Sequence, residues 1–215
     1  GKNNKGQLGL GHTDDKSTPE PVPEMNDVIA ISAANSHSLV LRKDLSVWAM
    51  GEASEGRLGT NAEMQKNPVR IRGAVGVTGI ASGSGHNFLI KENELYGMGR
   101  NQQGGLGLGE NSQPKIYSPT FVPNSKGVIF VSTGYDHTLF IKENKTLWGF
   151  GKNDKSQLGE DAKEILHTPE PINTDGKKVV AAACGRSFSL YLTEDGKLYG
   201  MGDNGYGQLK GPDKR

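Results

Sequence analysis

The chain contains little cysteine and no long apolar run. Cys184 is the single cysteine among 215 residues, so neither an internal disulfide nor a multi-cysteine zinc site can form. No stretch approaches the roughly 18 consecutive apolar residues of a membrane helix, and the N-terminal GKNNKGQLGLG lacks the apolar core of a signal peptide. These absences predict a chain without a membrane span in a reducing compartment, the cytoplasm or the nucleus.

An excess of charge of one sign is also missing. The 25 lysines and arginines nearly balance the 24 acidic residues, which leaves a formal net charge of +1. Binding to nucleic acid is driven largely by the release of phosphate counterions, so this balance argues against a nucleic-acid partner.

Sequence motifs for covalent chemistry, cofactors and metals are absent as well. There is no phosphate-binding G-x-x-x-x-G-K-(S/T) loop and no nucleophile motif, and the five histidines show no His-x-x-x-His spacing. We therefore expect no covalent catalysis, no cofactor and no metal site.

Glycine is abundant, with 31 residues that follow neither a Gly-X-Y period nor a linker-like tract. It marks a repeat of about fifty residues, visible in three columns. A glycine-rich block such as GKNNKGQLGLG recurs five times, with its leucine at Leu8, Leu58, Leu106, Leu158 and Leu209. A second column aligns His37, His86, His137 and Phe188, and a third places an aromatic residue three positions before Gly51, Gly99, Gly151 and Gly202.

Each repeat has the pattern of short β-strands. Apolar runs of four to eight residues alternate with tight polar turns, and no segment has a convincing helical pattern. Proline-containing segments at residues 18–22, 67–69, 118–121 and 168–172 suit outer-edge strands, where a missing N–H does no harm. One such unit cannot bury both faces of its sheet alone, so neighbouring units are expected to stack as the blades of a β-propeller, with the leucine and aromatic columns between them.

The three columns resemble the RCC1 repeat, named for the chromatin-associated exchange factor of the GTPase Ran. The resemblance covers the whole chain and implies an all-β, RCC1-like propeller in one domain, residues 1–215. Its repeats are approximately 1–50, 51–98, 99–150 and 151–201, with a partial repeat at 202–215. RCC1-like propellers usually have seven blades, whereas this chain provides about four. It is thus expected to form a partial ring, an open arc, or half of an assembly that a second copy or another chain completes.

The resemblance also suggests where a partner binds. In the Ran exchange factor, the turns before the G-x-x-H strands project carboxylate and imidazole groups toward the GTPase. Only the third repeat here carries the Asp-His pair of that factor, at Asp136 and His137. The other residues predicted to contact a partner occupy the same turns or the histidine column: Asn35, His37, His86, Tyr135 and Arg186. A histidine that recurs once per blade has an equally simple structural explanation, a hydrogen bond to a neighbouring strand.

Three functions are consistent with this pattern. The first is a protein-interaction propeller that binds a small Ran-like GTPase as an exchange factor, or as a bacterial mimic of RCC1 in a host cytosol. The second is a scaffold without a GTPase role, as the recognition part of a ubiquitin ligase, ciliary or organellar complex. The third is a secreted enzyme-inhibiting propeller. No extra segment resembles the β-wedge of the Ran factor, because the repeats are evenly spaced.

Overall fold

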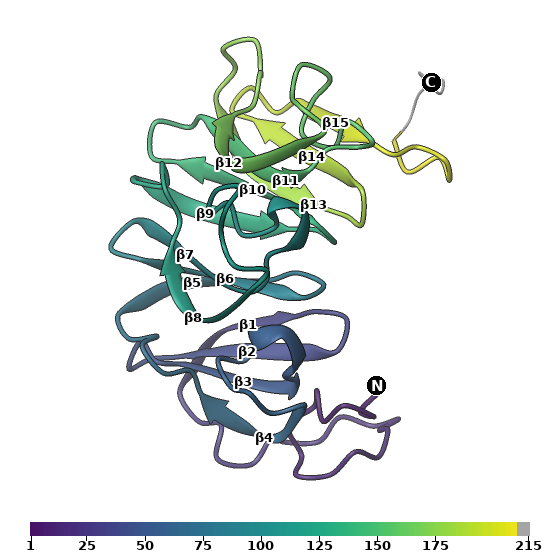
Figure 1. The fold of residues 1–215 in the computed structure, drawn as a ribbon. Coiled ribbons are helices and arrows are strands. Elements are labelled where there is room, and N and C mark those ends of the chain that lie inside the picture. Colours follow the sequence, from purple (N-terminus) through teal and green to yellow (C-terminus); the bar gives the residue numbers. More distant parts are fainter. Residues whose placement is uncertain (210–215) are drawn as a thin grey trace. The chain divides into compact units, whose positions relative to one another are not determined.

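The computed structural model describes residues 1–209, so the end of the partial fifth repeat lies outside the described residues. Its strands form four antiparallel sheets, each made from consecutive segments (Figure 1). The first sheet contains β1 (Val28–Ala33), β2 (His37–Arg42), β3 (Val47–Glu52) and β4 (Met64–Arg70). The second contains β5 (Val77–Ser82), β6 (His86–Lys91), β7 (Glu94–Arg100) and β8 (Lys115–Phe121).

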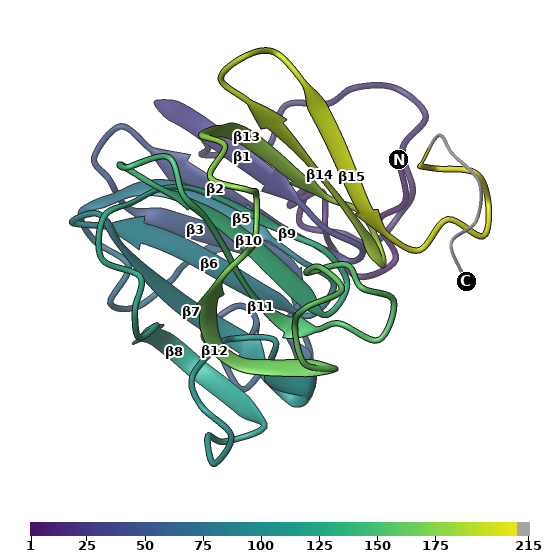
Figure 2. The same cartoon turned by 90° about the horizontal axis from the view of Figure 1, so that it is seen from above.

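The other two sheets repeat this plan. The third contains β9 (Val128–Thr133), β10 (His137–Lys142), β11 (Leu147–Lys152) and β12 (Ile165–Pro171), and the fourth contains β13 (Val179–Cys184), β14 (Phe188–Thr193) and β15 (Leu198–Gly202). Two short 3-10 turns, η1 (Ser54–Gly56) and η2 (Gln102–Gly104), fall in the glycine-rich blocks. Strand order follows sequence order in each sheet, as the labels β5 to β8 show in Figure 2. The sheets are the predicted propeller blades.

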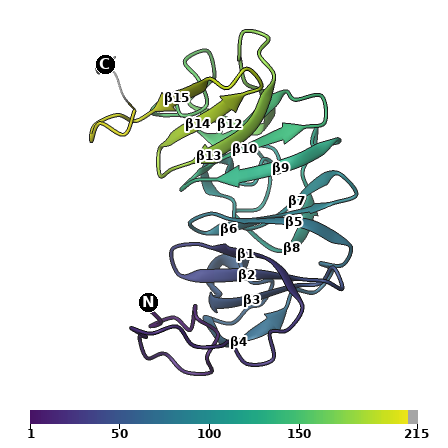
Figure 3. The same ribbon diagram turned by 180° about the vertical axis from the view of Figure 1, so that it is seen from behind.

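The chain forms two compact units of two blades each. Unit 1 comprises Gly1–Asn101 and Gln113–Phe121, and unit 2 comprises Gln102–Ser112 and the chain from Val122 onward. In unit 1, β5 packs against β1 and β2 (Figure 3). In unit 2, β13 packs against β9 and β10 in the same way.

The core of unit 1 lies between its two sheets. Its buried cluster joins Leu39, Val47 and Leu58 of the first blade with Leu89 and Met98 of the second. In unit 2 the side chains of Leu139, Leu158 and Ile172 pack over Gly149. The predicted burial of the leucine column is confirmed for Leu58, Leu106 and Leu158.

Proline positions agree with the prediction in three of four segments. Pro68, Pro119 and Pro169 lie in β4, β8 and β12, the outermost strands of their sheets, where no further strand needs their missing N–H. Residues 18–22 form no strand, so the prediction was wrong there. The other proline segments pair with the aromatic strand that precedes them, whereas residues 18–22 pair with no strand in the part of the chain that the structure describes.

Candidate protein-interaction surface

The predicted partner-binding turns lie beside the ends of the aromatic strands. In the first blade, the Glu52 N–H donates to the Ser36 carbonyl at 2.8 Å, and in the third the Lys152 N–H donates to the Asp136 carbonyl at 2.8 Å. Equivalent bonds join Arg100 to Gly85 and Asp203 to Ser187. Each G-x-x-H turn therefore shares its end of the blade with the residue after the repeated glycine. We call these two segments of each blade its turn surface.

The repeated glycine makes this approach feasible. Gly151 has φ of 98°, and a Cβ there would collide with the Asp136 carbonyl oxygen and lie 2.8 Å from the His137 Cα. Gly51 and Gly99 have nearly the same φ, 108° and 107°, and the same neighbours. The sequence keeps glycine at this position because a side chain would push the turn away from the strand.

The three histidines are buried beneath the turn surfaces. His37 and His137 are each 0% exposed, and His86 is 1% exposed. The His37 Nε2–H donates to the Asn87 Oδ1 of the next blade at 2.7 Å. These imidazole rings lie away from the surface, so a partner can contact the turns only through their neighbours.

His137 makes a similar bond in unit 2. Its Nε2–H donates to the Ser189 Oγ at 2.9 Å, because the Ser189 hydroxyl itself donates to the Gln157 carbonyl. Burial lowers the pKa of both His37 and His137 to about 4. The two rings are therefore neutral at physiological pH and link adjacent blades within each unit.

The other predicted contact residues are accessible. Tyr135, Arg186 and Asn35 are exposed, and Asp136 is half-buried. The Arg186 guanidinium carbon lies 5.2 Å from the Tyr135 ring centre, and the Tyr135 N–H donates to the Arg186 carbonyl at 3.3 Å. The structure thus brings Tyr135, Asp136 and Arg186 together in unit 2, whereas Asn35 lies in unit 1.

Charged side chains that the sequence analysis did not select complete the turn surface of unit 2. Lys152 Nζ lies 2.9 Å from the Asp154 Oδ2. This bond, together with the nearby charge of Asp136, raises the pKa of Lys152. A cation, two carboxylates and an aromatic ring paired with arginine are therefore presented together, the mixed chemistry that protein interfaces use.

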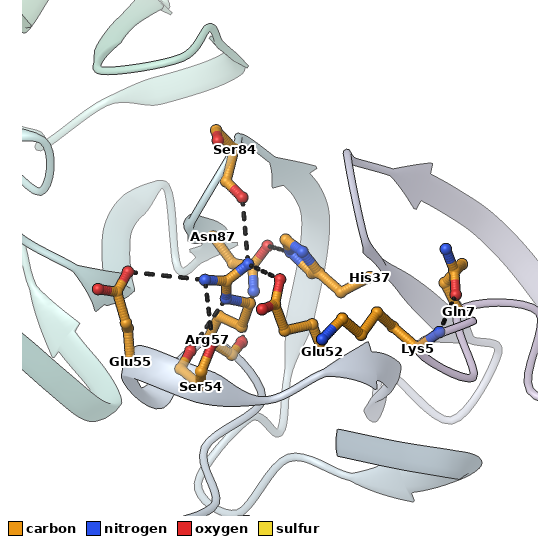
Figure 4. Close-up of polar contacts among 9 residues, drawn as sticks. All are labelled: Lys5, Gln7, His37, Glu52, Ser54, Glu55, Arg57, Ser84 and Asn87. Atoms are coloured by element: carbon orange, nitrogen blue, oxygen red, sulfur yellow. Dashed lines mark hydrogen bonds and ion pairs between the residues drawn. The ribbon is translucent and has the colours of Figure 1, made fainter. Parts of the chain in front are cut away.

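Unit 1 contains a buried arginine that the sequence analysis also missed (Figure 4). The Arg57 side chain is 8% exposed, and its Nη1 donates to the Glu52 Oε2 at 2.9 Å and to the Ser84 carbonyl at 3.3 Å. Its Nη2 lies 3.6 Å from the Glu55 Oε2. Arg57 therefore ties the turn of the second blade to two carboxylates of the first.

Sequence comparison between the repeats contained a signal for this site. Arg57 occupies the position of glutamine in G-Q-L, where Gln7, Gln157 and Gln208 accept a hydrogen bond from the amide two residues earlier. An arginine can only donate, so it must find acceptors elsewhere. The carboxylates at Glu52 and Glu55 supply them.

Substitutions in unit 2 separate structural from surface residues. Leu106→Ala is expected to cost about 2 to 5 kcal/mol, because Leu106 is fully buried. Asp136→Ala is expected to cost no more than about 1 kcal/mol, since the residue is only half-buried. Urea unfolding of both variants checks the difference, and equal large losses would show that Asp136 is a structural residue.

Three features of residues 1–209 bear on metal binding, nucleophilic chemistry and membrane insertion. No group of three or more His, Cys, Asp and Glu side chains in this range could hold a metal ion. The Cys184 thiol donates to the Ser132 carbonyl at 3.3 Å, and burial raises its pKa to about 12, which makes it a poor nucleophile. Within the same range, no helix has the length and apolarity required to span a bilayer.

Comparison with known proteins gives relatives along the whole chain. The family model described as the RCC1-like domain matches residues 1–215. The human probable E3 ubiquitin-protein ligase HERC6 is 30% identical over 97% of this chain and 22% of its own length. The ultraviolet-B receptor UVR8 of Arabidopsis thaliana is 28% identical over 97% of this chain and 49% of its own length. The chain thus spans about a fifth to a half of these two relatives.

Solved structures agree with this assignment. Human WBSCR16 is 27% identical, with a TM-score of 0.78 over 93% of this chain and 54% of that protein. Yeast RCC1 (Prp20), solved with Kap60, is 22% identical and shares the fold, with a TM-score of 0.81 over 91% of this chain and 48% of that one. By the family match over its full length and by its repeated blades, this chain belongs to the RCC1-like domain family.

Proposed function

We propose that the chain is a protein-recognition module that binds a partner protein through its turn surfaces. The observation that carries this proposal is the support beneath those surfaces in both units. Buried histidines and tightly packed glycines hold the turns, while Tyr135, Asp136 and Arg186 remain accessible on top. Side chains held in place before binding lose less conformational entropy when a partner docks.

We infer that a small Ran-like GTPase is the first partner to test. Asp136 supports this inference, because it matches the carboxylate of the Asp-His pair in the Ran exchange factor. One structural neighbour, Prp20p of Saccharomyces cerevisiae, is described with its binding properties to Gsp1p and histones. An exchange factor binds the nucleotide-free GTPase more tightly than the loaded one, and by linkage it weakens nucleotide binding by the same factor.

The test is the release of a fluorescent GDP analogue from purified Ran. If the proposal holds, stoichiometric amounts of the chain speed release by about tenfold or more, and Asp136→Ala removes most of that gain. Asp195→Ala serves as the matched control, because Asp195 is an exposed carboxylate in the turn between β14 and β15, at the opposite end of β14 from the Arg186 turn. No acceleration by the unmodified chain would contradict a role in exchange.

A second candidate is substrate or partner recognition in a ubiquitin ligase. The observation that favours it is the set of HERC relatives, of which HERC3 is 29% identical over 91% of this chain. Affinity capture with EDTA, and in parallel with Mg²⁺ and excess GTP, separates the two candidates. A GTPase retained only with EDTA supports exchange, whereas partners captured equally in both conditions, with no GTPase among them, support recognition in a ligase.

A further inference from the structure

The third blade has a surface hollow with an apolar floor. It lies in unit 2, between the loop after Leu158 and the chain that leaves β12, and has a volume of about 280 Å³. Leu158, Leu166 and Ile172 form the floor and are at most 7% exposed, while Pro171 lines the hollow from an exposed position. This size is close to the lower limit of ligand pockets, about 300 Å³, and suits one or two side chains better than a cofactor.

Carboxylates surround this floor. Four exposed acidic residues line the hollow: Glu160, Asp161, Glu170 and Asp175. Lys177 Nζ lies 3.1 Å from the Asp175 Oδ2, and no other lysine or arginine of residues 1–209 forms an ion pair with these four. The residues that line the hollow therefore carry negative charge only.

The first blade shows that the fold does not require these acids. Repeat alignment places Thr60 and Asn61 at the positions of Glu160 and Asp161. Val69 is the counterpart of Glu170, because Val69 lies opposite Ala49 in the first blade and Glu170 lies opposite the equivalent Gly149 in the third. None of the three first-blade residues is acidic, although both blades form the same four-stranded sheet.

Basic residues stand in the first blade where the third has neutral ones. Arg70 of the first blade corresponds to Pro171 of the third, because each lies opposite the tryptophan of its blade in the strand pairing. Arg72 of the first blade corresponds to Asn173 of the third, because each follows an equivalent isoleucine. The N–H of Ile71 donates to the Val47 carbonyl, and the N–H of Ile172 donates to the Leu147 carbonyl in the same way. The charge of this region thus changes sign between two blades of the same architecture, so packing does not account for the acids of the third.

We propose that the hollow receives a lysine or arginine side chain from a basic segment of a partner protein. Such side chains have an apolar stem and a charged tip, which match the apolar floor and the acidic rim. A compact metal ion does not fit, because no group of three or more potential ligands in residues 1–209 is arranged to hold one. This inference adds a second contact to the proposed protein recognition and does not depend on a GTPase partner.

The probe is a fluorescein-labelled seven-residue peptide with three consecutive basic residues, measured by fluorescence anisotropy. The test variant carries the first-blade residues, Glu160→Thr, Asp161→Asn and Glu170→Val, which the same architecture accommodates. Three ion pairs of modest strength are removed, so we expect binding to weaken by about tenfold. Binding by the unmodified chain should also weaken as the salt concentration rises from about 0.05 to 0.3 M.

The control variant removes three exposed carboxylates from unit 1, by Glu24→Gln, Glu63→Gln and Glu92→Gln. It has the same net charge as the test variant, so a change of less than about twofold would show that the effect is local. A peptide with norleucine in place of its basic residues is expected not to bind. Equal weakening by both variants, equal binding of the norleucine peptide, or no binding to the unmodified chain at about 1 mM would each overturn the proposal.

The same peptide separates this proposal from the proposed function. Tyr135→Ala alters the turn surface of unit 2 without touching the hollow, so peptide affinity should stay within about twofold of the unmodified chain. If the unmodified chain binds the peptide but does not accelerate GDP release, the GTPase proposal alone is contradicted. If it accelerates GDP release but does not bind the peptide, the proposal for the hollow alone is contradicted.

Discussion

Gly151→Ala is expected to lower the free energy of unfolding by about 3 to 5 kcal/mol. Two penalties combine at this position. An L-residue is strained at the φ of 98° that Gly151 adopts, and the added Cβ would collide with the Asp136 carbonyl. To avoid this collision, β11 would have to move away from the turn, which would break the hydrogen bond from the Lys152 N–H to the Asp136 carbonyl.

Gly159→Ala provides a matched control in the same blade. Gly159 has φ of 102°, and a Cβ there would meet no atom within 4 Å. It therefore retains the conformational penalty of about 1 kcal/mol and lacks the collision. Urea unfolding of both variants measures the difference, and equal losses would show that φ alone, without the close approach of strand and turn, explains the repeated glycine.

The regular parts of the fold were predictable because they recur. Four copies of one pattern gave the strand positions, the buried Leu58, Leu106 and Leu158, and the outer strands with proline. The aromatic column agrees only in part with its expected place between blades, because Tyr96 packs against the core of unit 1 but is not fully buried. Trp148 is only half-buried, with the Lys142 Nζ located 3.7 Å from the centre of its ring. Its strand position follows from the repeat, but its exposure depends on which neighbour covers it.

The candidate site was predictable in position but not in side-chain direction. The repeat located the turns, yet whether a histidine points inward depends on acceptors about fifty residues away, Asn87 for His37 and Ser189 for His137. Neither acceptor stands out in a single sequence. Arg57 is easier to find in the sequence, since three other repeats have glutamine at its position and Glu52 and Glu55 lie close to it in sequence.

These buried histidines also lead us to expect a loss of stability in mild acid. The Nε2–H of His37 and of His137 is a hydrogen-bond donor, whereas the buried Nδ1 of each ring has no hydrogen-bond partner. A second proton would place a positive charge on a buried ring, and at His37 the nearby charge of Arg57 also opposes that proton. The folded protein therefore resists protonation until the pH falls to about 4, whereas the unfolded chain takes up these protons near the ordinary histidine pKa of about 6.5.

The direction of the pH effect follows from proton uptake. Above about pH 6.5 neither state binds these protons, so the two histidines make no pH-dependent contribution. Between pH 6.5 and 4 the unfolded state binds more protons, so the free energy of unfolding falls as the pH falls. At pH 5 the expected loss is about 2 kcal/mol for each ring, or about 4 kcal/mol for both.

Urea unfolding at pH 7.5 and 5.0 measures this loss above the range in which exposed carboxylates titrate. A His37→Gln, His137→Gln double variant is expected to be less stable at pH 7.5 but to lose much less stability between the two pH values. Glutamine keeps an N–H donor for Asn87 and Ser189 and does not titrate. If the double variant retained the pH dependence of the unmodified chain, other groups would be responsible, and the rings would not be the neutral links between blades that their burial and hydrogen bonds indicate.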